Sequence, residues 1–124
     1  MSLTTRISSD RTFSRRVFIG GRLDTNTAPE LESELDKVTQ EAISLLIFDL
    51  SDLEYISSAG LRVIFKATKT IKAAGGQCGI LKMQPQIKKV FDIVKALPDV
   101  PIFKDDNEMD DYLDAMQQQA LGND

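Results

Sequence analysis

The segment from Leu45 to Phe65, LLIFDLSDLEYISSAGLRVIF, constrains the fold more than any other part of the chain. Its first residues are apolar at successive positions, which predicts a central strand whose two faces are both covered. A short acidic connection follows, and then Ser57 and Ser58 precede Gly60 and residues with helical spacing. The segment therefore predicts a buried strand that leads to two serines at the start of a helix.

The start of a helix presents unpaired backbone N–H groups and the positive end of the peptide dipoles, so it favours negative charge. A serine at this position can cap the helix with its hydroxyl oxygen, or it can carry a phosphate group. The residues alone leave both roles open for Ser57 and Ser58.

The segments before this one predict a hairpin and a helix. Leu3–Ser8 and Val17–Ile19 are strand candidates joined by a charged turn, and Gly20–Gly21 is expected to end the second strand. Asp24 lies in the next loop, where a solvated turn residue is the simplest interpretation. A capping box, with Pro29 in the first turn, is expected to begin a helix that has one apolar face. The box consists of Thr27 and Glu30, and the face consists of Leu31, Leu35, Val38 and Ala42.

The remaining segments alternate between strands and helices. We expect a helix after the serines that Gly75–Gly76 ends, and then a strand, a helix opened by Pro85, a short edge strand and a last helix. The two strands are Cys78–Met83 and Val100–Phe103. Repeated strand–helix–strand units favour a parallel sheet. The predicted fold is α/β, a mixed and largely parallel sheet of about five strands with about four helices, in one domain (1–116) followed by a polar tail (117–124).

Composition excludes several classes of function. A net charge of −4 gives no electrostatic reason to bind nucleic acid or an anionic membrane, and no apolar run is long enough to span a bilayer. The one cysteine, Cys78, cannot form an internal disulfide, and nothing resembles a signal peptide, so we expect a cytoplasmic protein. With no histidine, no Ser-His-Asp triad can form. No phosphate loop or nucleophile elbow is present either, and we expect no catalytic residues, cofactor or metal.

Four stretches together carry a resemblance to a known family. They are GRLD (21–24) followed by Thr27-Ala28, LIFDL (46–50), YISSAGL (55–61) and KKVFD (88–92), and they are spread over about four fifths of the chain. In this order and spacing the chain resembles the STAS-domain family, and within it the single-domain bacterial anti-sigma-factor antagonists. The resemblance implies a STAS-like fold and a role in signal transduction and transcription regulation.

The resemblance also implies a mechanism of partner switching. The unmodified protein, a monomer when free, would bind an anti-sigma factor that is also a serine kinase. Phosphorylation would break the complex, and a metal-dependent serine phosphatase would restore it. The family's phosphorylated serine lies two positions before the glycine, which is Ser58, with Ser57 as the alternative and otherwise the helix cap. The implied partner-binding residues are Asp24, Thr25, Asn26, Ser57, Ser58, Gly60, Arg62 and Lys66.

Three positions depart from the family pattern. Ser57 stands where many relatives have an aspartate, Ala59 stands where Ser or Thr is common, and Arg22 stands where GELD-like relatives carry an acid. Two other interpretations therefore stay open. The chain could be a STAS subunit of a transporter or another non-sigma complex, with Ser58 a cap or contact, or it could be a small enzyme or nucleotide-binding protein. The basic stripe Arg62, Lys66 and Lys69 is a partner contact or a solvated helix face.

Overall fold

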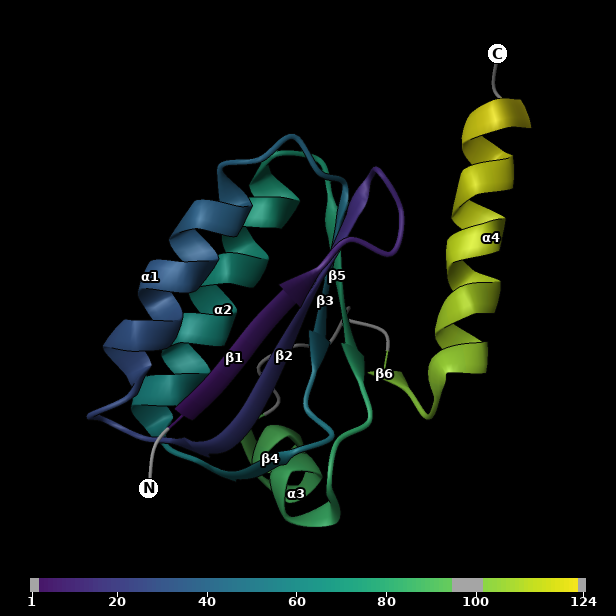
Figure 1. Ribbon diagram of the computed structural model, residues 1–124. Helices are drawn as coiled ribbons and strands as arrows, with labels where there is room; N and C mark the ends of the chain where they lie inside the picture. The colour runs from purple at the N-terminus through teal and green to yellow at the C-terminus, as the bar shows by residue number, and fades with distance from the viewer. Residues whose placement is uncertain (1–2, 95–101, 123–124) are drawn as a thin grey trace.

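A mixed sheet forms the centre of the protein. The structure is a computed structural model that describes residues 3–94 and 102–122, and these contain six strands and four helices (Figure 1). The main strand order is β1 (Leu3–Ser8), β2 (Ser14–Leu23), β3 (Leu45–Asp49), β5 (Gln77–Leu81) and β6 (Ile102–Phe103). A further strand, β4 (Leu53–Ile56), pairs with the far end of β2. Only the β1–β2 pair is antiparallel within these residues, which confirms a largely parallel mixed sheet.

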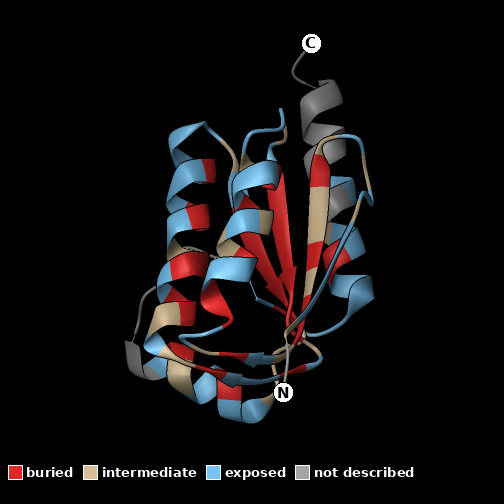
Figure 2. Cartoon of the chain, turned by 60° about the vertical axis from the view of Figure 1, so that its left-hand side comes forward, coloured by how far each residue is buried: buried red, intermediate tan, exposed pale blue. Residues whose placement is uncertain are grey.

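The helices cover the sheet from both faces. Helices α1 (Ala28–Thr39) and α2 (Ser58–Ala73) pack side by side on one face, while α4 (Asp106–Gly122) lies on the other (Figure 1). Helix α3 (Pro85–Val94) packs against β4 at one end of the sheet. Figure 2 shows buried residues gathered on the strands and on the inward sides of the helices. No helix within the described residues has the length and apolarity that crossing a membrane requires.

Strand β3 is buried along its whole length and separates two cores. Leu46 and Phe48 pack into the larger core with α1 and α2. Leu45 and Ile47 point to the opposite face, into a smaller core that also contains Leu81 of β5, Phe103 of β6 and Met109 of α4. Successive side chains of a strand point to opposite faces, so two covered faces require an uninterrupted apolar run. The predicted central strand is confirmed.

The region around β2 and β4 differs from the sequence-based expectation. Strand β2 does not end at Gly20–Gly21 but continues to Leu23, because Gly21 adopts a positive φ of 84° and the register shifts there. Strand β2 pairs with β3 over Ser14–Phe18 and with β4 over Gly21–Leu23, and the register shift lies within the β4 pairing. The short acidic connection expected after the central strand contains strand β4, in which Glu54 and Tyr55 are exposed.

The first helix begins by a different device from the expected one. Pro29 lies in the first turn as predicted, but the Thr27–Glu30 capping box does not form. The Thr27 hydroxyl instead donates to the Arg22 carbonyl (2.8 Å) and accepts from the Asp24 N–H (2.9 Å). The helix ends at Thr39, and Ala42 is therefore exposed rather than part of the apolar face.

The C-terminal elements also extend the sequence-based picture. Ile102 and Phe103 form the predicted edge strand, while residues 100–101 lie outside the described residues. Helix α4 continues to Gly122, so positions 117–122 of the predicted tail are helical. The domain boundary at 116 remains a prediction.

Candidate functional site

The two serines follow β4 directly and lie where β2 and β4 end. Leu23 of β2 pairs with Ile56 of β4, and the Ser57 N–H donates to the Leu23 carbonyl at 2.8 Å. Since the backbone of Ser57 is extended, its hydroxyl oxygen can turn back and accept from the Gly60 N–H at 3.2 Å. Ser57 is thus the N-cap of α2, as one of the two interpretations of this residue predicted.

Ser58 is the first residue of α2 and is exposed, whereas Ser57 is half-buried. Within residues 3–94 and 102–122 the Ser58 hydroxyl makes no hydrogen bond. It stands at the positive end of a 16-residue helix, a position that favours an anionic group. Because Ser57 already caps the helix, the Ser58 hydroxyl is accessible and chemically able to accept a phosphoryl group.

The Asp24 loop lies next to the serines through the Leu23–Ser57 hydrogen bond. Asp24 Oδ1 accepts from the N–H groups of Thr27 (3.0 Å) and Asn26 (2.9 Å). The Thr27 N–H has the largest effect and lowers the pKa of the Asp24 carboxyl; burial opposes it, and the Asn26 N–H then lowers the pKa further. Asp24 therefore stays ionised at neutral pH and shapes the loop, which leaves Thr25 and Asn26 exposed.

Gly60 is a glycine for an internal reason. The family resemblance implied Gly60 as a partner-binding residue, but Gly60 is buried. A Cβ atom built on it would lie 2.5 Å from Leu23 Cγ and 3.1 Å from the Leu23 carbonyl oxygen. The close packing of α2 on the end of β2 thus requires glycine here, and this packing fixes where the two serines lie.

The two predicted basic contacts on α2, Arg62 and Lys66, are both exposed. Lys66 Nζ bonds Glu32 Oε2 at 2.9 Å and lies 3.8 Å from Asp36 Oδ1, so it joins α2 to α1. The hydrogen bond to Glu32, followed by the charge of Asp36, raises the pKa of Lys66. The positive charge of Lys66 is therefore balanced by two acids of the same protein, whereas Arg62 makes no ion pair among the described residues.

An aromatic side chain for which the sequence indicated no role lies beside the serines. Tyr55 is 41% exposed, and the Arg22 guanidinium carbon lies 4.2 Å from its ring centroid. The signal available in the sequence was an aromatic residue inside a short acidic connection, two positions before Ser57. From the sequence, Arg22 was notable only as a departure from the family motif.

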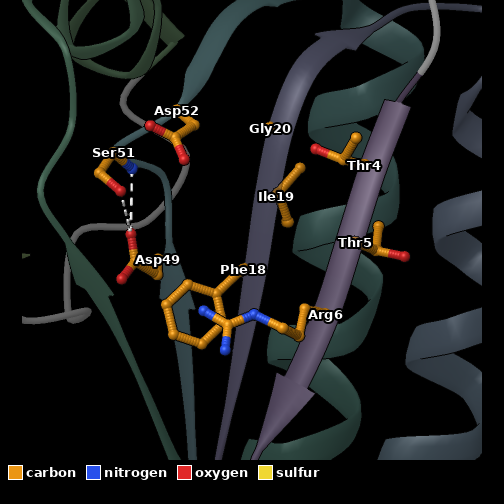
Figure 3. A pocket seen from close by; sticks show the side chains of 9 residues that line it. All are labelled: Thr4, Thr5, Arg6, Phe18, Ile19, Gly20, Asp49, Ser51 and Asp52. Atoms are coloured by element: carbon orange, nitrogen blue, oxygen red, sulfur yellow. Dashed lines mark hydrogen bonds between the residues drawn. The ribbon is translucent and has the colours of Figure 1, made fainter.

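A separate cavity of about 320 Å³ lies between β1, β2 and the β3–β4 connection (Figure 3). Arg6 stacks on Phe18 at one side of it, while Asp49 accepts from the Ser51 N–H and hydroxyl at the other. None of the predicted site residues lines this cavity. In the described part of the chain, no group of three or more Cys, Asp or Glu side chains is placed to hold a metal ion.

Comparison with known proteins defines the family. The sequence model of the STAS domain matches residues 10–109. The chain therefore belongs to the STAS-domain family, as its motifs and its sheet topology indicated. The fold likewise is that of solved STAS proteins, as the comparisons below show.

Two relatives and two solved structures give this likeness detail. Over 82 residues the chain is 32% identical to BtrV of Bordetella bronchiseptica, by name an anti-sigma factor antagonist, with 66% of this chain and 71% of that protein covered. It is 27% identical over 94 residues to the anti-sigma F factor antagonist of Paenibacillus polymyxa (75% and 79% covered). An anti-sigma factor antagonist from Mycobacterium paratuberculosis superposes with a TM-score of 0.78 at 25% identity (94% and 95% covered). SpoIIAA in its unphosphorylated form also gives 0.78, at 17% identity (90% and 97% covered), which shows the shared fold.

Proposed function

We propose that the protein is an anti-sigma-factor antagonist controlled by phosphorylation of Ser58. In the unphosphorylated form it binds an anti-sigma factor that is also a serine kinase, and so releases the sigma factor. The observation that carries this proposal is the division of tasks at the start of α2. Ser57 caps the helix, while Ser58 is exposed and makes no hydrogen bond among the described residues. The names of the two sequence relatives support the same class of function.

Charge is the physical basis of the proposed switch. A phosphate on Ser58 adds a charge of about −1.5 to −2 at neutral pH, and the N–H groups at the start of α2 can hold it. The neighbourhood of the serines is already acidic. Asp24 follows the end of β2, and Asp52 and Glu54 lie on the segment that leads to Ser57. The added charge and bulk eject the partner without a change of fold. A metal-dependent serine phosphatase returns the protein to its binding form.

In this proposal the protein is a ligand and a substrate, and it catalyses nothing itself. The kinase partner brings the ATP, and the cytoplasm, where sigma factors act, is the site of the reaction. Phosphorylation of the Ser58 hydroxyl needs no catalytic base from this chain, since the kinase supplies one. Purified protein incubated with ATP alone is expected to produce no turnover, and hydrolysis abolished by a point change in this chain would refute the proposal.

The direct test of the proposed function is release of a sigma factor. The unphosphorylated protein should displace sigma from a preformed complex with the anti-sigma-factor kinase, and Ser58→Asp should do so much less well. Each anti-sigma-factor kinase of the source genome is purified and tested in turn. Failure of the wild-type protein to bind or displace in every case would favour the alternative, a STAS subunit of a transporter or another non-sigma complex.

A further inference from the structure

We infer that Arg22 and Tyr55 form a second contact for the anti-sigma-factor partner, one that recognises a carboxylate set beside an apolar surface. The inference rests on the proposed function and deepens it, because the pair adjoins the two serines at the ends of β2 and β4. It assigns a binding role to one residue that departs from the family motif, Arg22, and to the first residue of the YISSAGL stretch, Tyr55.

The geometry of the pair is that of an exposed, stacked anchor. The β2–β4 register places Arg22 directly opposite Tyr55, and the guanidinium lies 4.2 Å from the ring centroid. Yet both residues are open to solvent, with 44% of the Arg22 side chain and 41% of Tyr55 exposed. Tyr and Arg are the residue types that most often dominate binding at interfaces.

The Arg22 guanidinium has donors to spare. Its Nε lies 3.8 Å from Asp24 Oδ2, which is beyond hydrogen-bond distance, and its side chain makes no hydrogen bond within the described residues. Asp24 meanwhile uses its other oxygen for the backbone of its own loop. Guanidinium presents a planar fork that matches a carboxylate bidentately, so a partner's Asp or Glu is the ligand that fits.

Stacking prepares this fork for binding. The ring and the strand pairing already restrict the Arg22 side chain, and less conformational entropy is then lost when a partner docks. A second stack in the protein provides a contrast. Among the described residues, two guanidiniums contact Phe18, from Arg6 at 4.0 Å and from Arg16 at 4.7 Å, whereas one contacts Tyr55. Tyr55 therefore keeps apolar surface that a partner can cover.

The surrounding charges restrict where the partner's carboxylate can lie. Asp52 and Glu54 are exposed on the segment that pairs with the end of β2, and the Asp52 carbonyl accepts from the Gly21 N–H at 3.0 Å. A partner acid is thus repelled by these two carboxylates and attracted by the Arg22 guanidinium beside them. Opposite charges set this close together help to fix the register of an interface and discriminate between partners.

The experiment measures Kd for each purified anti-sigma-factor kinase of the source genome, with unphosphorylated protein, by titration calorimetry. Arg22→Glu should weaken binding roughly tenfold or more, and Tyr55→Ala by several-fold, as expected for anchor residues. Tyr55→Phe keeps the ring and should bind like wild type. Two matched controls are used. Lys37→Glu makes an equal charge change at an exposed position of α1, and Ile102→Ala shortens an apolar side chain that is 49% exposed on β6.

The variants also separate the contact from a purely internal stack. If the ring positions the guanidinium, the double variant Arg22→Glu/Tyr55→Ala should lose less binding than the sum of the single changes. Melting temperatures of all variants should stay near that of wild type. Wild-type binding that Arg22→Glu and Tyr55→Ala alter no more than the two controls would overturn this inference and leave the proposed function standing. Absence of wild-type binding to every kinase would overturn both.

Discussion

At the scale of single residues, the site depends on two adjacent serines with different tasks. Ser57 caps the start of α2, while Ser58 is exposed at the same helix terminus. The sequence was sufficient to place both serines there, because helix starts have strong local signals. It was not sufficient to predict the partners of Thr27 or Lys66, since these are chosen by side chains and carbonyls that only the folded chain brings near.

The cap predicts a difference in stability between the two serines. Ser57→Ala should lower the free energy of unfolding by about 1 kcal/mol, because the Gly60 N–H loses its acceptor. Ser58→Ala should change it little. Urea denaturation of both variants measures this, and equal losses would contradict the assignment of the cap.

Gly60 predicts a steric effect at the same place. Gly60→Ala should cost about 1 to 3 kcal/mol of stability, because the added methyl group would overlap Leu23. Chemical denaturation again provides the measurement. Shortening the neighbour, as Leu23→Ala, should make the Gly60→Ala change less costly, and strictly additive losses would argue against the contact.

At the scale of elements, the strand and helix pattern was predictable where each element buries a whole face. The run at β3 and the helix faces of α1 and α2 have strong periodic signals. Strand β4 was not predicted from the sequence because it is short, and only Leu53 and Ile56 of its four residues are buried. The full length of β2 was not predicted because a glycine pair ordinarily ends a strand, whereas here β2 continues through the pair and changes its partner strand near it.

Lys66 predicts that α1 and α2 are coupled by charge. Lys66→Glu should lower the melting temperature, since it places an acid beside Glu32 and Asp36. Lys69→Glu, also exposed on α2, is the control for the charge change and should have a smaller effect. Similar melting temperatures for the two variants would mean that the pairing contributes nothing measurable.

The pH dependence of this pairing has a defined sign. Because the folded-state pKa of Lys66 is raised above 10.5, the stability it contributes is present below pH 10.5 and is lost as pH rises through the raised value. The difference in melting temperature between wild type and Lys66→Met should therefore shrink above pH 10.5. A difference that stays constant into strongly alkaline solution would point to packing by the lysine stem instead.

At the scale of the whole molecule, two cores lie on opposite faces of one sheet. The larger core joins α1, α2 and α3 to the strands, and the smaller one joins the start of α4. The family resemblance predicted this architecture well because its four motifs lie on elements that build the fold, namely the ends of β2 and β4, strand β3 and helix α3. It did not predict the stack of Arg22 on Tyr55, since these residues meet only through the pairing of β2 with β4.

Cys78 reports on the integrity of the larger core. It is 1% exposed, and burial raises the pKa of its thiol to about 11. The native protein should therefore resist thiol-reactive reagents at neutral pH and become labelled only on unfolding in denaturant. Rapid labelling without denaturant would show that the core opens locally around β5.

The most direct test of the central claim locates the phosphate. Wild type, Ser57→Ala and Ser58→Ala are treated with the cognate anti-sigma-factor kinase and ATP and then analysed by mass spectrometry of intact protein and peptides. We predict one phosphate, on Ser58, in wild type and in Ser57→Ala, and none in Ser58→Ala, which should stay folded and bind the kinase constitutively. Phosphate on Ser57, with Ser58→Ala still a full substrate, would contradict the account.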